Sequence, residues 1–146
     1  MTKRRESLAL WVALSRAYEK VAGASRRHAE ARGLRVTEFG VLEALYHLGP
    51  MRLCDLRRKI LVSSGGVTLV VDRLEGRGLV ARVPDPADRR ARLVELTPEG
   101  RRLIERIFPE HAEHIEGATA GLAGVDRKVA IRLLRRLAAE SPEQGT

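Results

Sequence analysis

The feature that most constrains the fold is a change in hydrophobic period near residue 79. Up to that point, apolar residues recur at the three- and four-residue spacing of one helix face. Beyond it, 79–83 and 91–97 are short runs with the composition of β-strands. The connecting segment 84–90 contains two prolines, which cannot donate ladder hydrogen bonds, and it exceeds a two-residue turn. We therefore predict helices followed by one β-hairpin with an extended, basic loop.

Four helices are expected before the hairpin. The first covers residues 1–32, and three shorter helices follow it. Thr37 is suited to cap the second helix, and Ser63 and Ser64 are suited to cap the fourth. The residues expected on the inward faces of the shorter helices are Phe39, Leu42, Leu45, Leu53, Leu56, Ile60, Val67, Val70, Val71 and Leu74.

Two further helices are expected after the hairpin. The fifth begins at Thr97-Pro98-Glu99, where a hydroxyl caps the helix, proline takes its first position and an acid lies in its first turn. Pro109 should kink or interrupt this helix. Asp126 is suited to cap the sixth helix.

The first and sixth helices carry more apolar surface than one small lobe can cover. We therefore predict a homodimer in which these stripes pack on a second copy of the chain. The residues predicted to form the dimer contact are Trp11, Leu14, Tyr18, Val129, Leu133 and Leu137.

The length and charge of the chain limit its partners. Its 146 residues fit one compact domain, and its net charge of +8 with a pI near 10.7 indicates a polyanionic partner. Nucleic acid is the first candidate, and an anionic membrane surface is the second. No apolar run approaches the ~18 residues needed to cross a bilayer, and no secretory signal is recognisable. A single cysteine also suits a reducing compartment, so we expect a cytoplasmic protein.

The third and fourth helices, joined by 61–63, form a candidate helix-turn-helix. The second helix of such a motif buries one face and presents the other to a DNA major groove about 12 Å wide. The residues expected to point away from the core are mostly small, which allows close approach to base edges. An alternative is that the two serines only cap the helix. The outward residues are Ser64, Gly65, Thr68, Leu69 and Asp72.

The hairpin loop is the second candidate DNA-binding element. Arg89, Arg90 and Arg92 concentrate positive charge there, and a protruding arginine can enter a narrow, electronegative minor groove. The alternative is a solvated charged loop without function, which is the commoner fate of such runs. Its position directly after a helix-turn-helix favours the DNA-binding interpretation.

The residues around these two elements resemble one protein family. They are Val67-Thr68, Asp72-Arg73-Leu74-Glu75, Gly78-Leu79-Val80, Arg82, Asp85-Pro86, Asp88-Arg89-Arg90-Ala91 and Leu96-Thr97-Pro98-Glu99-Gly100. Together with the chain length and helix order, they resemble the multiple-antibiotic-resistance regulator (MarR-type) family of bacterial winged-helix transcription regulators.

The resemblance implies a mostly α fold with a small β-hairpin, in which 1–146 form a single domain. It places a winged helix-turn-helix lobe at 35–98 and dimerisation helices at 1–33 and 99–140. It also implies a homodimeric repressor that binds double-stranded DNA at a palindromic operator and responds to a small-molecule effector of unknown identity. The candidate DNA-binding residues are Ser63, Ser64, Gly65, Thr68, Leu69, Arg73, Arg89 and Arg90, and the candidate wing-supporting residues are Asp72 and Asp88.

One position departs from the family pattern. Residue 69 is usually polar or basic in such sequences and is leucine here. A leucine can contact a thymine methyl group but cannot read guanine. The preferred operator is therefore left open by the sequence.

Two other side-chain groups could suggest sensing. Cys54 has no second cysteine and no activating neighbour in the sequence, so we interpret it as a structural thiol. His111 and His114 have a spacing that could place two imidazoles on one metal ion. A polar helix face at the dimer is the alternative, and we expect no metal and no cofactor.

An enzymatic function finds no support in the motifs. The sequence contains no GxSxG elbow, no phosphate loop and no HExxH pair. Two non-enzymatic alternatives are a basic architectural DNA-binding protein without a ligand response and an amphipathic membrane-surface protein. The basic hairpin and the dimerisation helices favour the regulator.

Overall fold

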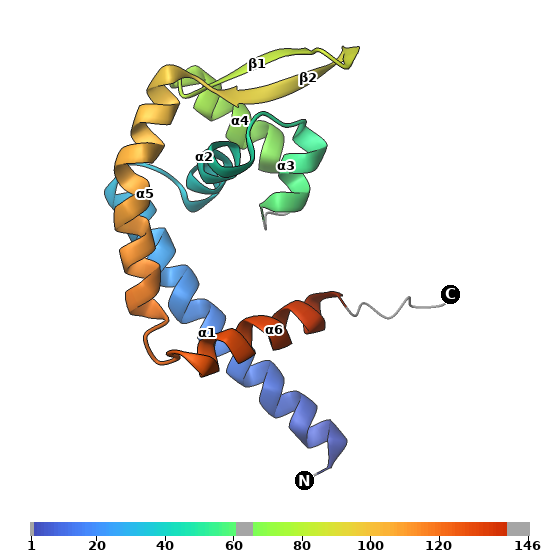
Figure 1. The fold of residues 1–146 in the computed structure, drawn as a ribbon, viewed down its shortest axis with the longest axis vertical. Helices are drawn as coiled ribbons and strands as arrows, with labels where there is room; N and C mark the ends of the chain where they lie inside the picture. Colours follow the sequence, from blue (N-terminus) through green and yellow to red (C-terminus); the bar gives the residue numbers. More distant parts are fainter. Residues whose placement is uncertain (1, 61–65, 140–146) are drawn as a thin grey trace.

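The computed structural model describes residues 2–60 and 66–139. In the described residues, four helices are followed by a two-stranded antiparallel hairpin and two final helices, as Figure 1 shows. The predicted fold class, mostly α with one small hairpin, is confirmed. The elements are α1 (Lys3–Ala31), α2 (Val36–Leu48), α3 (Leu53–Lys59), α4 (Gly66–Gly76), β1 (Val80–Asp85), β2 (Asp88–Leu96), α5 (Pro98–Ala118) and α6 (Val125–Ala139).

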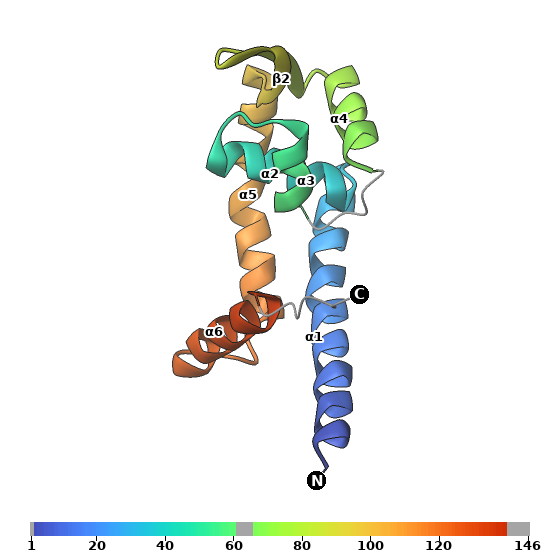
Figure 2. The same ribbon diagram turned by 90° about the vertical axis from the view of Figure 1, so that its right-hand side faces the viewer.

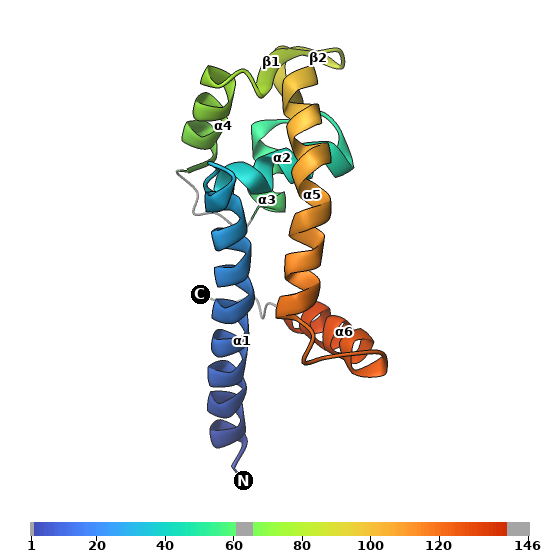
Figure 3. The ribbon, with the colours of Figure 1, turned by 90° about the vertical axis from the view of Figure 1, so that its left-hand side faces the viewer.

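The molecule has two parts, a winged lobe and a stalk. The winged lobe consists of α2, α3, α4 and the hairpin, which gather at one end of the molecule. The stalk consists of α1, α5 and α6. Figures 2 and 3 show α1 and α5 as two long helices extending away from the lobe, with α6 turning off from the far end of α5.

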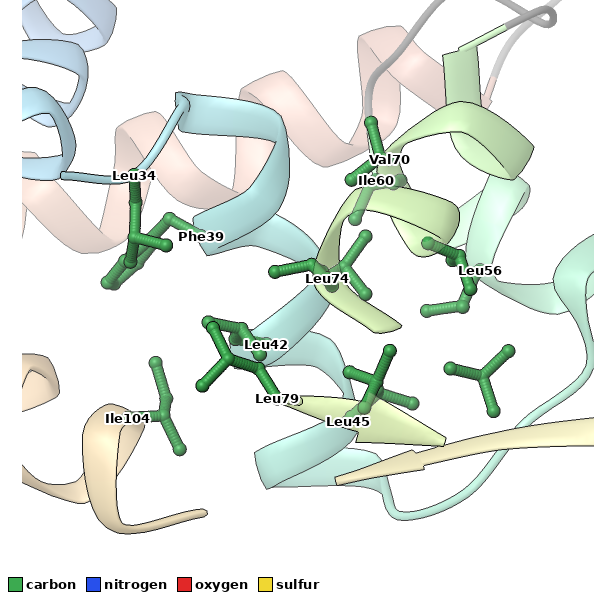
Figure 4. Packing of buried hydrophobic residues seen from close by; sticks show 14 of the residues in the cluster. Leu34, Phe39, Leu42, Leu45, Leu56, Ile60, Val70, Leu74, Leu79 and Ile104 are labelled. Carbon is green, nitrogen blue, oxygen red and sulfur yellow. The ribbon is translucent and has the colours of Figure 1, made fainter. Parts of the chain in front are cut away.

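The core lies inside the winged lobe and extends to the adjoining ends of α1 and α5. Figure 4 shows how leucines from three helices and from the start of the hairpin converge in it. Of the inward residues predicted from the sequence, all are buried except Leu53, which is half-buried and packs against the core. The helical period therefore predicted the inward faces correctly, because it depends only on neighbours within four positions.

The first turns of two helices differ from the expectation. α2 begins at Val36, so Thr37 lies within its first turn, and the Arg35 N–H instead donates to Glu38 Oε1 at 3.2 Å. α6 begins at Val125, so Asp126 also lies inside the helix. Gly124, with φ of 56°, makes the turn before it. The cap predicted at Thr97 is confirmed, since its Oγ1 accepts from the Gly100 N–H at 3.0 Å.

The predicted extended hairpin loop is wrong. β1 and β2 continue to Asp85 and Asp88, and the chain reverses in two residues, Pro86 and Ala87. Proline is well suited to this turn position, and Asp85 Oδ1 accepts the Ala87 N–H at 2.9 Å. The register then shifts, because Pro84 pairs with Arg92, and 89–91 have no partner on β1. The basic residues therefore lie in a bulge beside a tight turn.

The fifth helix runs without interruption through Pro109, so the predicted interruption did not occur. Pro109 and Glu105, whose carbonyl loses its helical N–H partner, are both exposed. Water can satisfy that carbonyl, which makes the proline tolerable there. None of the described helices is long and apolar enough to span a membrane.

Candidate nucleic-acid interface

The exposed face of α4 presents small and apolar side chains. Thr68 and Leu69 are exposed, and Leu69 keeps 51% of its surface accessible. The opposite face is buried in the core through Val67, Val70, Val71 and Leu74. α4 is thus fixed by one face and free on the other, as a recognition helix requires. Ser63, Ser64 and Gly65, also predicted as DNA contacts, lie outside the described residues.

Asp72 connects α4 to the hairpin. Its Oδ1 accepts from Arg82 Nη2 at 2.6 Å, and Arg82 Nη1 donates to Glu75 Oε1 at 3.0 Å. The other Glu75 oxygen accepts the Arg82 backbone N–H at 3.2 Å. Arg73, predicted to bind DNA, is half-buried on the same helix. Arg82 was not among the predicted site residues, although Asp72 and Glu75 share one helix face at i, i+3 and could have indicated a common cation.

The tip of the hairpin carries exposed arginines. Arg89 and Arg90 are exposed, and Figure 1 shows the hairpin projecting beyond the helices of the lobe. Asp88, predicted to support the wing, accepts the Arg90 N–H through Oδ1 at 3.0 Å. Asp88 therefore shapes the tip from within and is not seen to attach it to another described element.

A second ion pair joins the hairpin to the start of α3. Arg52 Nε and Nη2 lie 2.8 and 2.7 Å from Asp85 Oδ2. The Ala87 N–H and the Arg52 guanidinium hold the pKa of Asp85 below its usual range, and the carboxylate correspondingly raises the pKa of Arg52. The sequence did not indicate a role for Arg52, because Arg52 and Asp85 are 33 residues apart and no local pattern connects them.

The predicted dimer residues lie on the stalk. Trp11 and Tyr18 are 65% and 61% exposed, Leu133 and Leu137 are also exposed, and Leu14 and Val129 are half-buried. α6 has no buried residue along its described length. An apolar surface of this kind marks an interaction site.

A hollow of about 600 Å³ lies where the lobe meets α1. Burial raises the pKa of Glu43 in its wall, while nearby His47 lowers it to a lesser degree. Lys59 belongs to the same wall. The remaining lining is mainly apolar and comes from α1, α2, the end of α3 and one residue of α5: Tyr18, Val21, Ala22, Ser25, Val36, Thr37, Gly40, Ala44, Leu48, Ile60 and Ile115.

The histidines on α5 are not simply a polar helix face. His111 is buried, and its ring centroid lies 5.6 Å from that of His28 on α1. His114 lies 4.8 Å from His28 by the same measure. Both ring nitrogens of His28 lack a hydrogen-bond partner within the described ranges, and burial lowers the pKa of His28 and of His111. Among the described residues, no group of three His, Cys, Asp or Glu side chains is arranged to hold a metal ion.

The thiol of Cys54 is exposed on α3. It therefore takes no part in the core, and its interpretation as a structural rather than a sensing thiol stays a prediction. Leu56 and the half-buried Leu53 supply the inward face of this short helix.

The chain is similar to known regulators over most of its length. The MarR family model matches residues 34–91, which cover α2 to the hairpin tip. The HTH-type transcriptional regulator MhqR of Bacillus subtilis is 39% identical over 90% of this chain and 91% of its own length. The chain belongs to the MarR family. It is a DNA-binding transcriptional regulator with a winged helix-turn-helix.

Two further relatives support this assignment. The HTH-type transcriptional repressor NicR of Pseudomonas putida is 32% identical over 90% of this chain and 83% of its own length. The structure of BpsR from Bordetella bronchiseptica, whose DNA binding is regulated by 6-hydroxynicotinic acid, superposes with a TM-score of 0.77. BpsR has 34% sequence identity, and the match covers 89% of this chain and 92% of that chain.

Proposed function

We propose that this MarR-family regulator is a ligand-responsive repressor that binds a palindromic operator as a homodimer. The observation that carries this proposal is that one lobe exposes both a helix face and a pair of arginines. α4 buries one face and exposes the other, and the hairpin tip of the same lobe carries two exposed arginines, Arg89 and Arg90. A helix for the major groove and a cationic wing for the minor groove would read neighbouring parts of one half-site.

The residues of these elements have different tasks in this proposal. Thr68 and Leu69 contact base edges, and Arg73 contacts the DNA backbone. Arg89 and Arg90 enter the minor groove, where sequence is read through groove width. Asp72 and Asp88 support the wing. From the segment before α4, Ser63, Ser64 and Gly65 are proposed to contact DNA at the helix start.

A second copy of the chain is proposed to cover the stalk. The exposed apolar residues of α1 and α6 form the contact, and the two lobes then lie on either side of a dyad. Recognition helices related in this way sit about 34–36 Å apart, or roughly 10–10.5 base pairs between half-site centres. An operator with dyad symmetry follows from that geometry.

The hollow between the lobe and α1 is the proposed effector site. Its apolar lining suits a small aromatic body, and Lys59 offers a positive charge for an acidic group. The related BpsR responds to an aromatic hydroxy acid, which supports this chemical class. Since α1 also carries the proposed dimer contact, a ligand there would change how the lobes are spaced. We further propose a non-enzymatic protein acting in the cytoplasm.

The decisive experiment compares Arg90→Ala with Thr68→Ala on several operator variants. Arg90→Ala should weaken binding to all of them and reduce the slope of log affinity against log salt by about 0.9 for each phosphate that is no longer neutralised. Thr68→Ala should act only at particular base positions, with a cost of ~1 kcal/mol and little change in slope. Melting and sedimentation first verify that both variants remain folded and dimeric.

Two results would contradict the proposal. An Arg90→Ala variant with unchanged affinity and slope would remove the wing from the interface. Binding without any preferred sequence, or footprints without dyad symmetry, would instead indicate a basic architectural protein.

A further inference from the structure

The wing is the β1–β2 hairpin, and few pairings between its two strands hold its tip in place. Beyond Pro84, which has no N–H to donate, the ladder contains a single pairing, Asp85 with Asp88. The three residues 89–91 have no partner on β1. A two-stranded ribbon is only marginally stable in water, so its end needs another attachment to keep one position.

The start of α3 supplies such an attachment at two points. Met51 forms an antiparallel bridge with Val94 on β2, with N···O distances of 3.1 and 2.9 Å. The next residue, Arg52, extends its side chain to Asp85, where two guanidinium nitrogens contact one carboxylate oxygen. The bridge fixes the middle of the hairpin, and the ion pair fixes its end.

The Arg52–Asp85 pair is better placed than an ordinary surface ion pair. The side chain of Asp85 is only 9% exposed, so water competes poorly for its oxygens. Its other oxygen accepts the Ala87 N–H and thereby shapes the turn. One carboxylate thus joins the conformation of the tip to the position of α3.

We propose that Arg52 is a positioning residue for the wing: through Asp85 it sets where Arg89 and Arg90 stand relative to the recognition helix. This inference rests on the proposed minor-groove role of the wing. Arg52 need not contact DNA to influence affinity, because it restricts the positions that the wing arginines sample before binding. Because the wing arginines are already ordered, the conformational entropy lost on binding is smaller.

The test uses the full-length protein and a single operator at several salt concentrations. Arg52→Met should weaken binding about threefold to tenfold and lower the salt slope by up to about 0.9 for each phosphate that the wing no longer neutralises. Asp85→Asn should have the same effect, because its amide can still accept the Ala87 N–H but cannot pair with Arg52 as an ion. Arg102→Met, which removes an exposed arginine from α5, is the matched control and should change the slope less.

The Asp85 variant separates positioning from direct contact. If Arg52 simply bound a phosphate, removing the nearby negative charge of Asp85 would strengthen DNA binding. Stronger binding by Asp85→Asn therefore overturns the inference.

Combination with Arg90→Ala completes the test. If Arg52 acts through the wing, Arg52→Met should cost much less in the Arg90→Ala background than in the wild type. Fully additive losses would overturn the inference while leaving the wing's role intact. An Arg90→Ala variant that binds normally would overturn both proposals, so the two failures are distinguishable. Melting temperature and dimerisation are measured for every variant.

Discussion

The winged lobe and the last helix of the stalk, α6, contain similar aliphatic residues, but the lobe buries them and α6 leaves them exposed. In the lobe, Leu42 and Leu74 are fully inaccessible to solvent. On the stalk, Leu133 and Leu137 remain 41% and 47% exposed on a helix whose described residues include none that is buried. The lobe therefore closes its core together with the adjoining ends of α1 and α5, whereas α6 presents an apolar surface that another molecule can cover.

The two regions meet where α1 and α5 approach α2. Only the last part of α1 is buried, with Ala29 and His28 packed near Phe39 of the lobe. Arg32, which follows α1, forms an ion pair with Glu110 of α5 beside them. Because this junction links the winged lobe to the proposed dimer helices, changes in one region can reach the other through it.

The largest expected effect separates the two regions by stability. Leu42→Ala in the lobe should lower the free energy of unfolding by about 2–5 kcal/mol, because it leaves a cavity in a closed core. Leu48→Ala is the matched control, since Leu48 belongs to the same helix but is 58% exposed. Urea unfolding followed by circular dichroism measures both. Equal losses would contradict the presence of a closed core around Leu42.

A smaller effect on folding, but a specific one on assembly, is expected in the stalk. Leu133→Asp should shift the protein from dimer to monomer, since a carboxylate would be buried without a partner at the contact. Leu69→Asp makes the same substitution at a similarly exposed leucine of the lobe and should leave the dimer intact. Sedimentation velocity at micromolar protein distinguishes the two. A dimer that survives Leu133→Asp would contradict the assignment of α6 to the contact.

The smallest effect is expected where the lobe meets the stalk, and it concerns how the stability of the fold depends on pH. The pKa values of His28 and His111 lie below their ordinary value of 6.5 because burial disfavours the charged imidazole. The unfolded chain therefore binds more protons than the folded one below about pH 6.5, and folding stability falls as the pH is lowered through that range. Stability is fully retained above it. Urea unfolding at pH 7.5 and at pH 5.5 measures the difference.

His28→Leu should reduce this acid sensitivity, because one of the two titrating groups is gone. His47→Leu, which removes an exposed histidine, is the control and should keep it. His114 and Arg32 also lower the pKa of His28, and the Glu110 carboxylate lies 3.7 Å from its Nε2. An unchanged pH dependence in His28→Leu would place the acid-sensitive groups elsewhere.

Some local features were predictable from the sequence, and contacts between distant segments were not. The inward residues of the helices and the Thr97 cap depend on neighbours a few positions apart, so their pattern was visible. The tight turn at Pro86 was not predicted. The Asp85 carboxylate stabilises it by accepting the Ala87 N–H, so the hairpin needs no longer loop there. Pro109 was tolerated within α5 because that side of the helix faces solvent.

The same division applies to the candidate nucleic-acid interface. Local spacing and residue type were sufficient to predict the order of elements, the buried and exposed faces of α4 and the basic character of the wing. Three contacts became apparent only in the folded chain: Arg82 is shared by two acids of α4, Arg52 reaches Asp85, and His28 joins His111. These contacts join elements that meet only after the core has closed. Their specificity comes from the position of the backbone in space, which local periodicity does not encode.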